Sequence, residues 1–325
     1  MPELFKESFK KYKSKCPPPD FSEVINFGSK SSIQIEGVKN GKIVNPVHLC
    51  GLQPVSQWKI SEIENNPGMI HVVNPFTDVG HRYWVCRALS SYTQRPESKL
   101  SLDGIGDLQE DEDWWELCTR DAFRAKHLQP GLRWATMGYH HNWNTKIYSE
   151  EERDAFPGDL AALSQCIANA VGYSDFCAEA AIVNFYHKNS ALAGHTDHSE
   201  RNLEAPLLSF SFGCSAVFLI GGKTLETKPT AMFLHSGDLV IMAGESRLCY
   251  HSVPKILPTS ENLSEEVPCC SPCKDCCCIL DADLFTKCSD NEFWEPFKKY
   301  IEKSRINLNV RQVLYPGETR LISET

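Results

Sequence analysis

The second half of the sequence consists largely of short apolar segments separated by glycine and proline turns, and this pattern limits the fold more than any other feature. Many short strands at such spacing are typical of a β-sandwich or a β-barrel. We therefore predict a mostly β protein with flanking α-helices. The expected strands lie at residues 180–186, 207–212, 215–220, 231–235, 238–242, 247–251 and 305–314.

Two helices are predicted before this strand-rich region. Residues 1–15 carry aromatic and aliphatic side chains at helical spacing, which is typical of a helix that docks on the rest of the protein. A mitochondrial targeting helix is the less favoured alternative, because Glu3 and Glu7 interrupt it and arginine is absent. A second helix is expected to begin after Pro157, with Asp159 as its N-cap. Its apolar stripe consists of Leu160, Leu163, Ile167 and Val171.

Length and composition limit the class of protein. With 325 residues, of which 42% are hydrophobic, the chain can bury a substantial core. No segment approaches the run of about 18 apolar residues that spans a membrane, and no secretory signal begins the sequence. We therefore expect a soluble intracellular protein without a membrane partner, in the nucleus, the cytoplasm or the mitochondrion. A formal charge of -9 argues against non-specific coating of nucleic acid but is compatible with a local basic groove.

Fifteen cysteines are present, and without a secretory signal we interpret them as reduced thiols. Many of them cluster in what we interpret as a loop insertion at residues 257–291. There Cys270, Cys273 and Cys276 have spacing compatible with zinc, and Cys288 could supply a distant partner. A structural zinc site normally uses two separated pairs, so a reduced, oxidisable loop is the simpler interpretation.

A candidate metal site begins at His195-X-Asp197, which follows an apolar segment. Residues two apart in an extended segment point the same way, so both side chains could reach one metal. His251, at the end of another predicted strand, is well placed as the third ligand. Two imidazoles and one carboxylate are the ligands of non-haem Fe(II) oxygenases, although zinc hydrolases use similar sets and ordinary histidines remain the alternative.

The predicted strand near the C-terminus suggests what binds beside the metal. Polar residues alternate with apolar ones from Arg305 to Arg311, so both arginines, Asn307 and Asn309 share one face. Buried arginines are costly unless an anion meets them, and their planar forks suit carboxylates. The strand therefore predicts a site for a small dicarboxylate. Asn184 and Tyr186, just before the metal motif, could donate to the same ligand.

Taken in order, Asn184-X-Tyr186, His195-X-Asp197, His251 and Arg305-X-Asn307-X-X-X-Arg311 resemble the AlkB family of Fe(II)- and 2-oxoglutarate-dependent dioxygenases. Residues 51–56, 132–139, 207–213 and 230–238 are similar to the AlkB homologue 1 subfamily in particular. The resemblance implies a double-stranded β-helix, or jelly roll, with an N-terminal nucleotide-recognition lid. We expect an N-terminal extension at 1–66, the lid and its supporting helices at 67–178, and the dioxygenase core at 179–316.

The resemblance also implies a role for each polar residue of the set. His195, Asp197 and His251 would hold Fe(II). Arg305, helped by Tyr186, would bind the distal carboxylate of 2-oxoglutarate. The keto-acid end of this cosubstrate would be held by Arg311, Asn307 and Asn184.

The implied reaction uses O2 and 2-oxoglutarate to hydroxylate a methyl group on a nucleobase, and an N-hydroxymethyl product then releases formaldehyde. The substrate would be 1-methyladenine or 5-methylcytosine in tRNA, or 6-methyladenine in DNA, and the base must be unstacked or single-stranded. Expected substrate contacts are Trp115, Tyr139 and His141 by stacking, together with Glu200. Burial in the core is the alternative for these aromatic residues.

Other functions stay open at this stage. One is a non-catalytic scaffold that binds nucleic acid or protein, which two inward arginines and an intact triad disfavour. Another is histone demethylation by the same chemistry. Many DNA-repair members of the family resemble H-X-D-X-D, whose second acid can meet a cationic base. That position is Ser199 here, so the resemblance does not imply a preference for cationic lesions.

Overall fold

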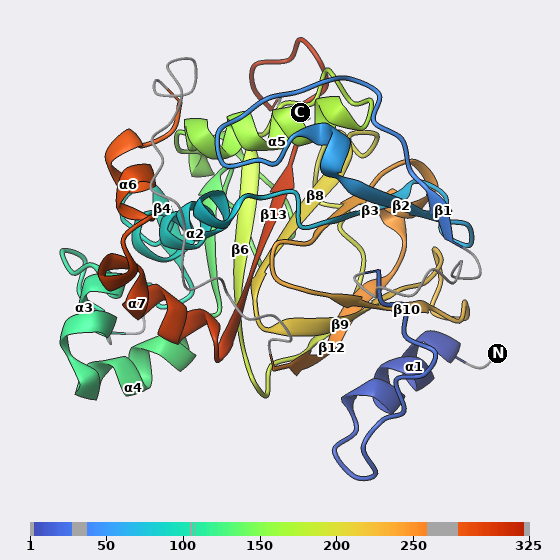
Figure 1. Ribbon diagram of the computed structural model, residues 1–325, viewed down its shortest axis with the longest axis horizontal. Coiled ribbons are helices and arrows are strands. Elements are labelled where there is room, and N and C mark those ends of the chain that lie inside the picture. The colour runs from blue at the N-terminus through green and yellow to red at the C-terminus, as the bar shows by residue number, and fades with distance from the viewer. Residues whose placement is uncertain (1–2, 28–37, 105, 107, 259–278, 322–325) are drawn as a thin grey trace.

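Two antiparallel β-sheets face each other and enclose a cavity (Figure 1). The structure, a computed structural model, describes residues 3–27, 38–104, 106, 108–258 and 279–321. The large sheet has the order β1-β2-β3-β11-β8-β13-β6-β5-β4, and the small sheet has the order β10-β9-β12-β7. This is the double-stranded β-helix that the resemblance to the AlkB family implies. The strands are β1 Val38–Asn40, β2 Lys59–Ile63, β3 Met69–Val73, β4 Ser98–Leu100, β5 Trp134–Gly138, β6 Ala180–His187, β7 Leu192–His195, β8 Leu207–Gly213, β9 Ser215–Ile220, β10 Thr230–Leu234, β11 Leu239–Met242, β12 His251–Leu257 and β13 Ser304–Arg311.

Strand β13 lies between β6 and β8 in the large sheet, and its two faces differ as predicted. Successive side chains of a strand point to opposite faces, so one face is apolar and the other polar. The apolar face, made of Ile306, Leu308 and Val310, is buried in the largest hydrophobic cluster. The polar face, made of Arg305, Asn307, Asn309 and Arg311, lines the cavity between the sheets.

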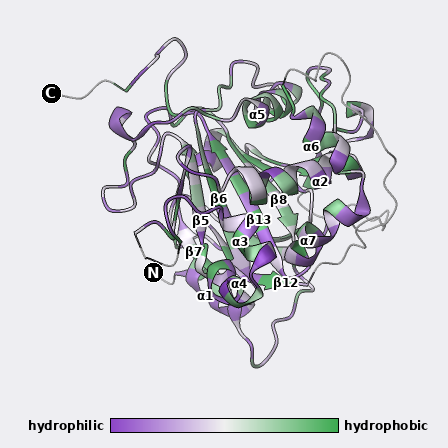
Figure 2. Ribbon diagram, turned by 90° about the vertical axis from the view of Figure 1, so that its left-hand side faces the viewer, coloured by the Kyte–Doolittle hydropathy of each residue, from purple (hydrophilic) through white to green (hydrophobic). Residues whose placement is uncertain are grey.

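Helices cover the outer face of the large sheet. Apolar residues of α2, α3, α5 and α7 share one hydrophobic cluster with β6, β8 and β13. Figure 2 shows hydrophobic residues concentrated in the sheets and on α5, with hydrophilic residues in the surrounding loops. The helices are α1 Leu4–Lys13, α2 Asp78–Cys86, α3 Trp114–Arg120, α4 Ala122–Gly131, α5 Gly158–Ala170, α6 Ala282–Lys287 and α7 Asn291–Ile301, with shorter turns at Val55–Gln57, Arg87–Ser91, Glu150–Glu152 and Gly244–Leu248. Within the described residues, no helix has the length and apolar character needed to cross a membrane.

The predicted N-terminal helix docks on the small sheet. Phe5 and Tyr12 of α1 are buried together with Val217 and Leu219 of β9. The helix lies beside β12 and β7, apart from the helices on the large sheet (Figure 1). The sequence therefore identified both this helix and its apolar face.

The prediction of a strand at 247–251 is wrong. Residues Gly244–Leu248 form a 3-10 helix, and β12 begins only at His251. Gly244 has a φ of 52°, a left-handed conformation that breaks an extended chain. The Ser246 backbone N–H donates to Ala243 O at 3.1 Å, which closes the turn.

The prediction that Asp159 caps a helix is also wrong. The residue lies inside α5, which is preceded by Pro157. Its buried carboxylate accepts hydrogen bonds from Tyr83 Oη at 2.8 Å and from Arg87 Nε at 2.6 Å. Asp159 therefore joins α5 to the α2 region, and sequence position alone could not distinguish this role from capping. The division at residues 66 and 178 stays a prediction, although β1–β3 extend the large sheet across the first boundary.

Candidate metal and cosubstrate site

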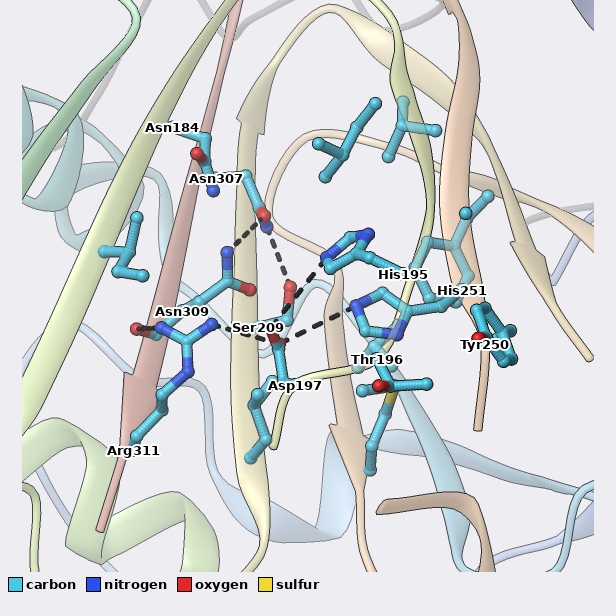
Figure 3. A pocket seen from close by; sticks show the side chains of 18 of the residues that line it. Asn184, His195, Thr196, Asp197, Ser209, Tyr250, His251, Asn307, Asn309 and Arg311 are labelled. Carbon is cyan, nitrogen blue, oxygen red and sulfur yellow. Dashed lines mark hydrogen bonds and ion pairs between the residues drawn. The ribbon is translucent and has the colours of Figure 1, made fainter. Parts of the chain in front are cut away.

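A cavity of about 470 Å³ lies between the two sheets and contains the polar residues singled out in the sequence. Side chains from β7 and β12 of the small sheet line one side, and side chains from β6, β8 and β13 of the large sheet line the other. Figure 3 shows the two histidines side by side, with Asp197 between them and Arg311. The predicted metal and cosubstrate residues are thus brought together.

The three predicted metal ligands converge at one end of β7. His195 ends β7 and is the cross-strand partner of His251, the first residue of β12. Asp197 Oδ1 lies 3.9 Å from His195 Nε2, and Asp197 Oδ2 lies 3.7 Å from His251 Nε2. One ligand atom from each residue lies within 4.8 Å of the others. The spacing is suited to a single metal ion between them.

Hydrogen bonds to the backbone orient both imidazoles. His195 Nδ1 lies 3.0 Å from Ala193 O, and His251 Nδ1 lies 3.2 Å from Cys249 O. We assign the proton to Nδ1 in each ring, because only a donor suits a carbonyl oxygen. The Nε2 lone pairs then face Asp197 and are free to bind a metal.

The charge states also suit a metal. Burial, and then the neighbouring His195, lowers the pKa of His251 to about 4, so its ring is neutral near neutral pH. Burial raises the pKa of Asp197. Arg311 and the two histidines together lower it by more, so the pKa lies well below its usual range. Two imidazoles and one carboxylate with open positions form the donor set typical of non-haem Fe(II) sites.

Arg311 belongs to a buried network of charges that fixes Asp197. Its Nη2 lies 3.0 Å from Asp197 Oδ2, and its Nε lies 3.0 Å from Glu200 Oε1. Arg247 Nη2 lies 2.8 Å from Glu200 Oε2, and Arg247 Nη1 donates to Asp197 O at 2.6 Å. Burial lowers the pKa of Arg311, but Asp197, Tyr148 and Glu200 together raise it by more, so the guanidinium stays charged.

Arg305 has a different environment. Its side chain is 1% exposed. It donates to uncharged oxygens, namely Ser211 Oγ at 2.7 Å and Cys214 O at 3.3 Å. Within the described part of the chain, its Nε has no hydrogen-bond partner and the guanidinium has no ion pair. Burial lowers its pKa to about 10, which still leaves it charged at neutral pH. Such a group indicates a binding site for an anion.

Amide groups lie between the two arginines on β13, and further polar groups face them from β6. Asn307 Nδ2 donates to Ser209 Oγ at 2.8 Å, and Asn309 Nδ2 donates to Asn307 Oδ1 at 3.0 Å. Asn184 and Tyr186 on β6 line the same cavity, and Tyr186 is the cross-strand partner of Arg305. The predicted polar set therefore follows the cavity from the metal ligands to Arg305.

Residues 87–311 match the sequence profile of the 2OG-Fe(II) oxygenase superfamily. The chain is 38% identical to "Nucleic acid dioxygenase ALKBH1" of Homo sapiens, over 96% of this chain and 84% of that protein. The chain belongs to this superfamily, within the AlkB homologue 1 group. It is also 29% identical to "tRNA demethylase abh1" of Schizosaccharomyces pombe, with 95% of each chain covered. Similarity to "DNA N(6)-methyladenine demethylase ALKBH1A" of Arabidopsis thaliana is likewise 29%, over 93% of this chain and 90% of that protein.

Membership confirms the resemblance seen in the sequence and implies Fe(II) and 2-oxoglutarate as cofactors. The triad of His195, Asp197 and His251 fits the iron site of such an enzyme. The proposed zinc ligands Cys270, Cys273 and Cys276 lie outside the described residues.

Two of the aromatic residues predicted to contact the substrate lie in the protein interior. Trp115 is 7% exposed and stacks on Phe297 of α7, with ring centroids 4.7 Å apart. Tyr139 is fully buried; its hydroxyl donates to Glu150 and accepts from Arg153 Nη1 at 2.8 Å. Neither residue lines the cavity, because both side chains pack against other residues inside the fold.

The remaining substrate predictions divide in the same way. Glu200 is buried under Arg247 and Arg311 and does not line the cavity. His141 does line it, beside Trp143, whose ring centroid lies 4.7 Å away. Trp143 is 45% exposed, and Lys146 lines the same part of the cavity. The sequence pointed to this aromatic cluster but did not single out Trp143, because exposure depends on the fold.

Proposed function

We propose that this chain is an oxidative demethylase or hydroxylase of methylated nucleobases, with Fe(II) on His195, Asp197 and His251 and 2-oxoglutarate extending from the metal to Arg305. One observation carries the proposal: a single cavity contains a three-residue metal donor set and, elsewhere on its wall, a buried arginine without an acidic partner in the described chain. A metal-bound dicarboxylate satisfies both features.

The residues along the cavity have separate tasks in this scheme. Arg305 and Tyr186 would bind the distal carboxylate, with Ser211 holding the guanidinium in place. Asn184, Asn307 and Arg311 would donate to the keto-acid end, and Arg311 would also keep Asp197 oriented and ionised. Iron bound at the triad supplies the oxidation of a methyl C–H bond to hydroxymethyl by O2, coupled to conversion of 2-oxoglutarate into succinate and CO2.

The outer part of the cavity suits a nucleobase. His141 and Trp143 present aromatic rings there, and Lys146 could meet a phosphate. Stacking of a base on such rings contributes about 1 to 3 kcal/mol. The names of the relatives support tRNA and DNA as carriers of the methylated base. We therefore propose 1-methyladenine or 5-methylcytosine in tRNA, or 6-methyladenine in DNA, and a location in the nucleus, cytoplasm or mitochondrion.

The test measures turnover on matched oligonucleotides with and without one methylated base. Purified protein with Fe(II), ascorbate and 2-oxoglutarate is incubated with tRNA stem-loops or single-stranded DNA that carry one methylated base, and with the unmethylated sequence. We expect succinate in proportion to base oxidation, measured by mass spectrometry of nucleosides, and formaldehyde from N-methyl bases. Asp197→Ala should abolish both. The proposal fails if metal-loaded protein oxidises no base in this panel.

A further inference from the structure

We propose that Phe5 of the N-terminal helix is a positioning residue for the metal site, because it holds strand β7, and with it His195, against β12. The inference rests on the proposed metal site. Phe5 is only 1% exposed although α1 lies at the periphery of the fold (Figure 1). Its backbone N–H also donates to Leu225 O at 3.0 Å, which fixes the start of the helix.

The ring of Phe5 occupies a space, here called the Phe5 seat, that two glycines leave open. A Cβ atom on Gly194 would lie 2.7 Å from Phe5 Cε1, and a Cβ atom on Gly221 would lie 2.7 Å from Phe5 Cδ2. Neither glycine has a positive φ. The backbone conformation therefore permits other residues at both positions, and the space taken by the Phe5 ring is what requires glycine there.

The two glycines lie next to two of the proposed metal ligands. Gly194 precedes His195 in β7. Gly221 follows Ile220, the cross-strand partner of His251, and its N–H donates to Tyr250 O at 2.8 Å. The ring of Tyr250, next to His251 and visible in Figure 3, lies 6.2 Å from that of Phe5. One side chain thus contacts the chain segments that carry both imidazoles.

Strand β7 needs such support because the sheet holds it weakly. It has four residues, lies at the edge of the small sheet and pairs only with β12 among the described strands. Its two recorded register pairs are separated by an irregularity. Helix α1 packs against both β7 and β12, which lie close to it in Figure 2. A short, irregular edge strand opens easily, so side-chain packing decides where His195 stands.

The other end of α1 offers a matched control. Tyr12 is 4% exposed and stacks on Phe21 with ring centroids 6.2 Å apart. Lys255 Nζ donates to Ser14 O at 2.7 Å, which anchors this end separately. Tyr12→Ala therefore removes a buried aromatic side chain from the same helix without emptying the Phe5 seat.

The first experiment titrates the full chain with Mn(II) and follows free metal by electron paramagnetic resonance. Loss of an outer support of a metal ligand typically weakens binding by 10- to 100-fold, so we expect Phe5→Ala to raise the Mn(II) Kd by about 10-fold. Phe5→Leu should restore most of the affinity. Tyr12→Ala should lower Tm as Phe5→Ala does but leave the Kd within about twofold of wild type. Hydrogen exchange in residues 192–198 should accelerate only in Phe5→Ala.

A double-mutant cycle tests the contact itself. Gly194→Ala alone should weaken Mn(II) binding, because its methyl group collides with the Phe5 ring. In the Phe5→Ala background the same methyl group has room, so its additional effect should largely disappear. Additive effects would overturn the inference, as would a Phe5→Ala Kd equal to that of Tyr12→Ala. If wild-type protein binds no Mn(II), the proposed metal site fails instead, so the two failures are distinguishable.

Discussion

The two buried arginines of β13 lie in the same cavity wall but differ in how their charge is met. Arg311 contacts two carboxylates, Asp197 and Glu200, each at 3.0 Å. Arg305 donates only to uncharged oxygens, and the described chain gives it no ion pair. A buried guanidinium costs free energy unless an anion neutralises it. The protein therefore neutralises the charge of Arg311 with its own carboxylates, whereas the charge of Arg305 requires an anionic ligand.

This difference separates support from binding. Arg311, with Glu200 and Arg247 behind it, belongs to a charge network that holds Asp197 in position. Arg305 is held by Ser211, and the described chain gives it no acidic partner. We expect substitutions near Arg311 to act mainly on stability, and substitutions near Arg305 to act mainly on 2-oxoglutarate binding.

The largest effect is expected for Arg305→Ala. Removing one partner of a buried charge pair costs about 3 kcal/mol, so KM for 2-oxoglutarate should rise about 100-fold. The free energy of unfolding without cosubstrate should not fall, because an uncompensated buried charge is removed. Succinate formation and urea unfolding measure the two quantities. Arg305→Lys keeps the charge without the planar fork and should lie between. An unchanged KM in Arg305→Ala would show that Arg305 does not bind the cosubstrate, and the contrast with Arg311 would fail.

Glu200→Gln should show the opposite pattern. The substitution keeps the shape of the side chain but leaves Arg247 and Arg311 with one negative charge fewer between them. We expect the free energy of unfolding to fall by about 2 kcal/mol, as breaking a buried ion pair does when part of its hydrogen bonding survives. KM for 2-oxoglutarate should change far less than in Arg305→Ala. A large rise in KM with unchanged urea unfolding would mean that Glu200 serves binding.

Lowering the pH should destabilise the part of the large sheet around Arg305, because a neutral histidine, His81, supports it. His81 Nε2 lies 2.7 Å from Ser236 Oγ, which accepts from the N–H of Gly213, the cross-strand partner of Arg305. Burial, and then Arg82, lowers the pKa of His81 to about 4 from 6.5. The folded-state pKa is the lower one, so its contribution to stability is present above pH 6.5 and is lost as pH falls towards 4.

Between pH 7 and pH 5 this loss amounts to about 2 kcal/mol. His81→Gln keeps a hydrogen-bonding side chain but cannot titrate. Its free energy of unfolding, measured in urea at each pH, should therefore fall by that much less than in wild type over the same interval. Parallel pH profiles for the two proteins would show that His81 does not support this end through its neutral state.

Features of this site that depend on residues close together in the sequence were predictable, and features that depend on distant residues were not. Alternation along one strand placed Arg305, Asn307, Asn309 and Arg311 on one face, because strand periodicity is a local property. The metal motif His195-X-Asp197 was predictable for the same reason. The pairing of Glu200 with Arg247 was not, because the two residues come from separate segments that only the fold brings within 2.8 Å.

Aromatic residues show the same limit. Trp115 and Tyr139 suited base stacking by residue type, yet Trp115 packs on Phe297 and Tyr139 on Arg153. Trp143, close to Tyr139 in sequence, is instead 45% exposed beside the cavity. Burial of an aromatic ring depends on the distant residues that cover it, which neither spacing nor composition reveals.

The smallest effect, and the finest test of the comparison, concerns the hydroxyl group that holds Arg305. Ser211 is fully buried, and its Oγ accepts from Arg305 Nη2 at 2.7 Å. Ser211→Ala removes this bond but keeps the charge, so KM for 2-oxoglutarate should rise about fivefold, corresponding to about 1 kcal/mol. Ser164→Ala is the matched control, since Ser164 Oγ is equally buried in α5 but has no hydrogen-bond partner among the described residues. Equal KM values for the two variants would mean that Arg305 needs no fixed orientation, and that its charge alone attracts the cosubstrate.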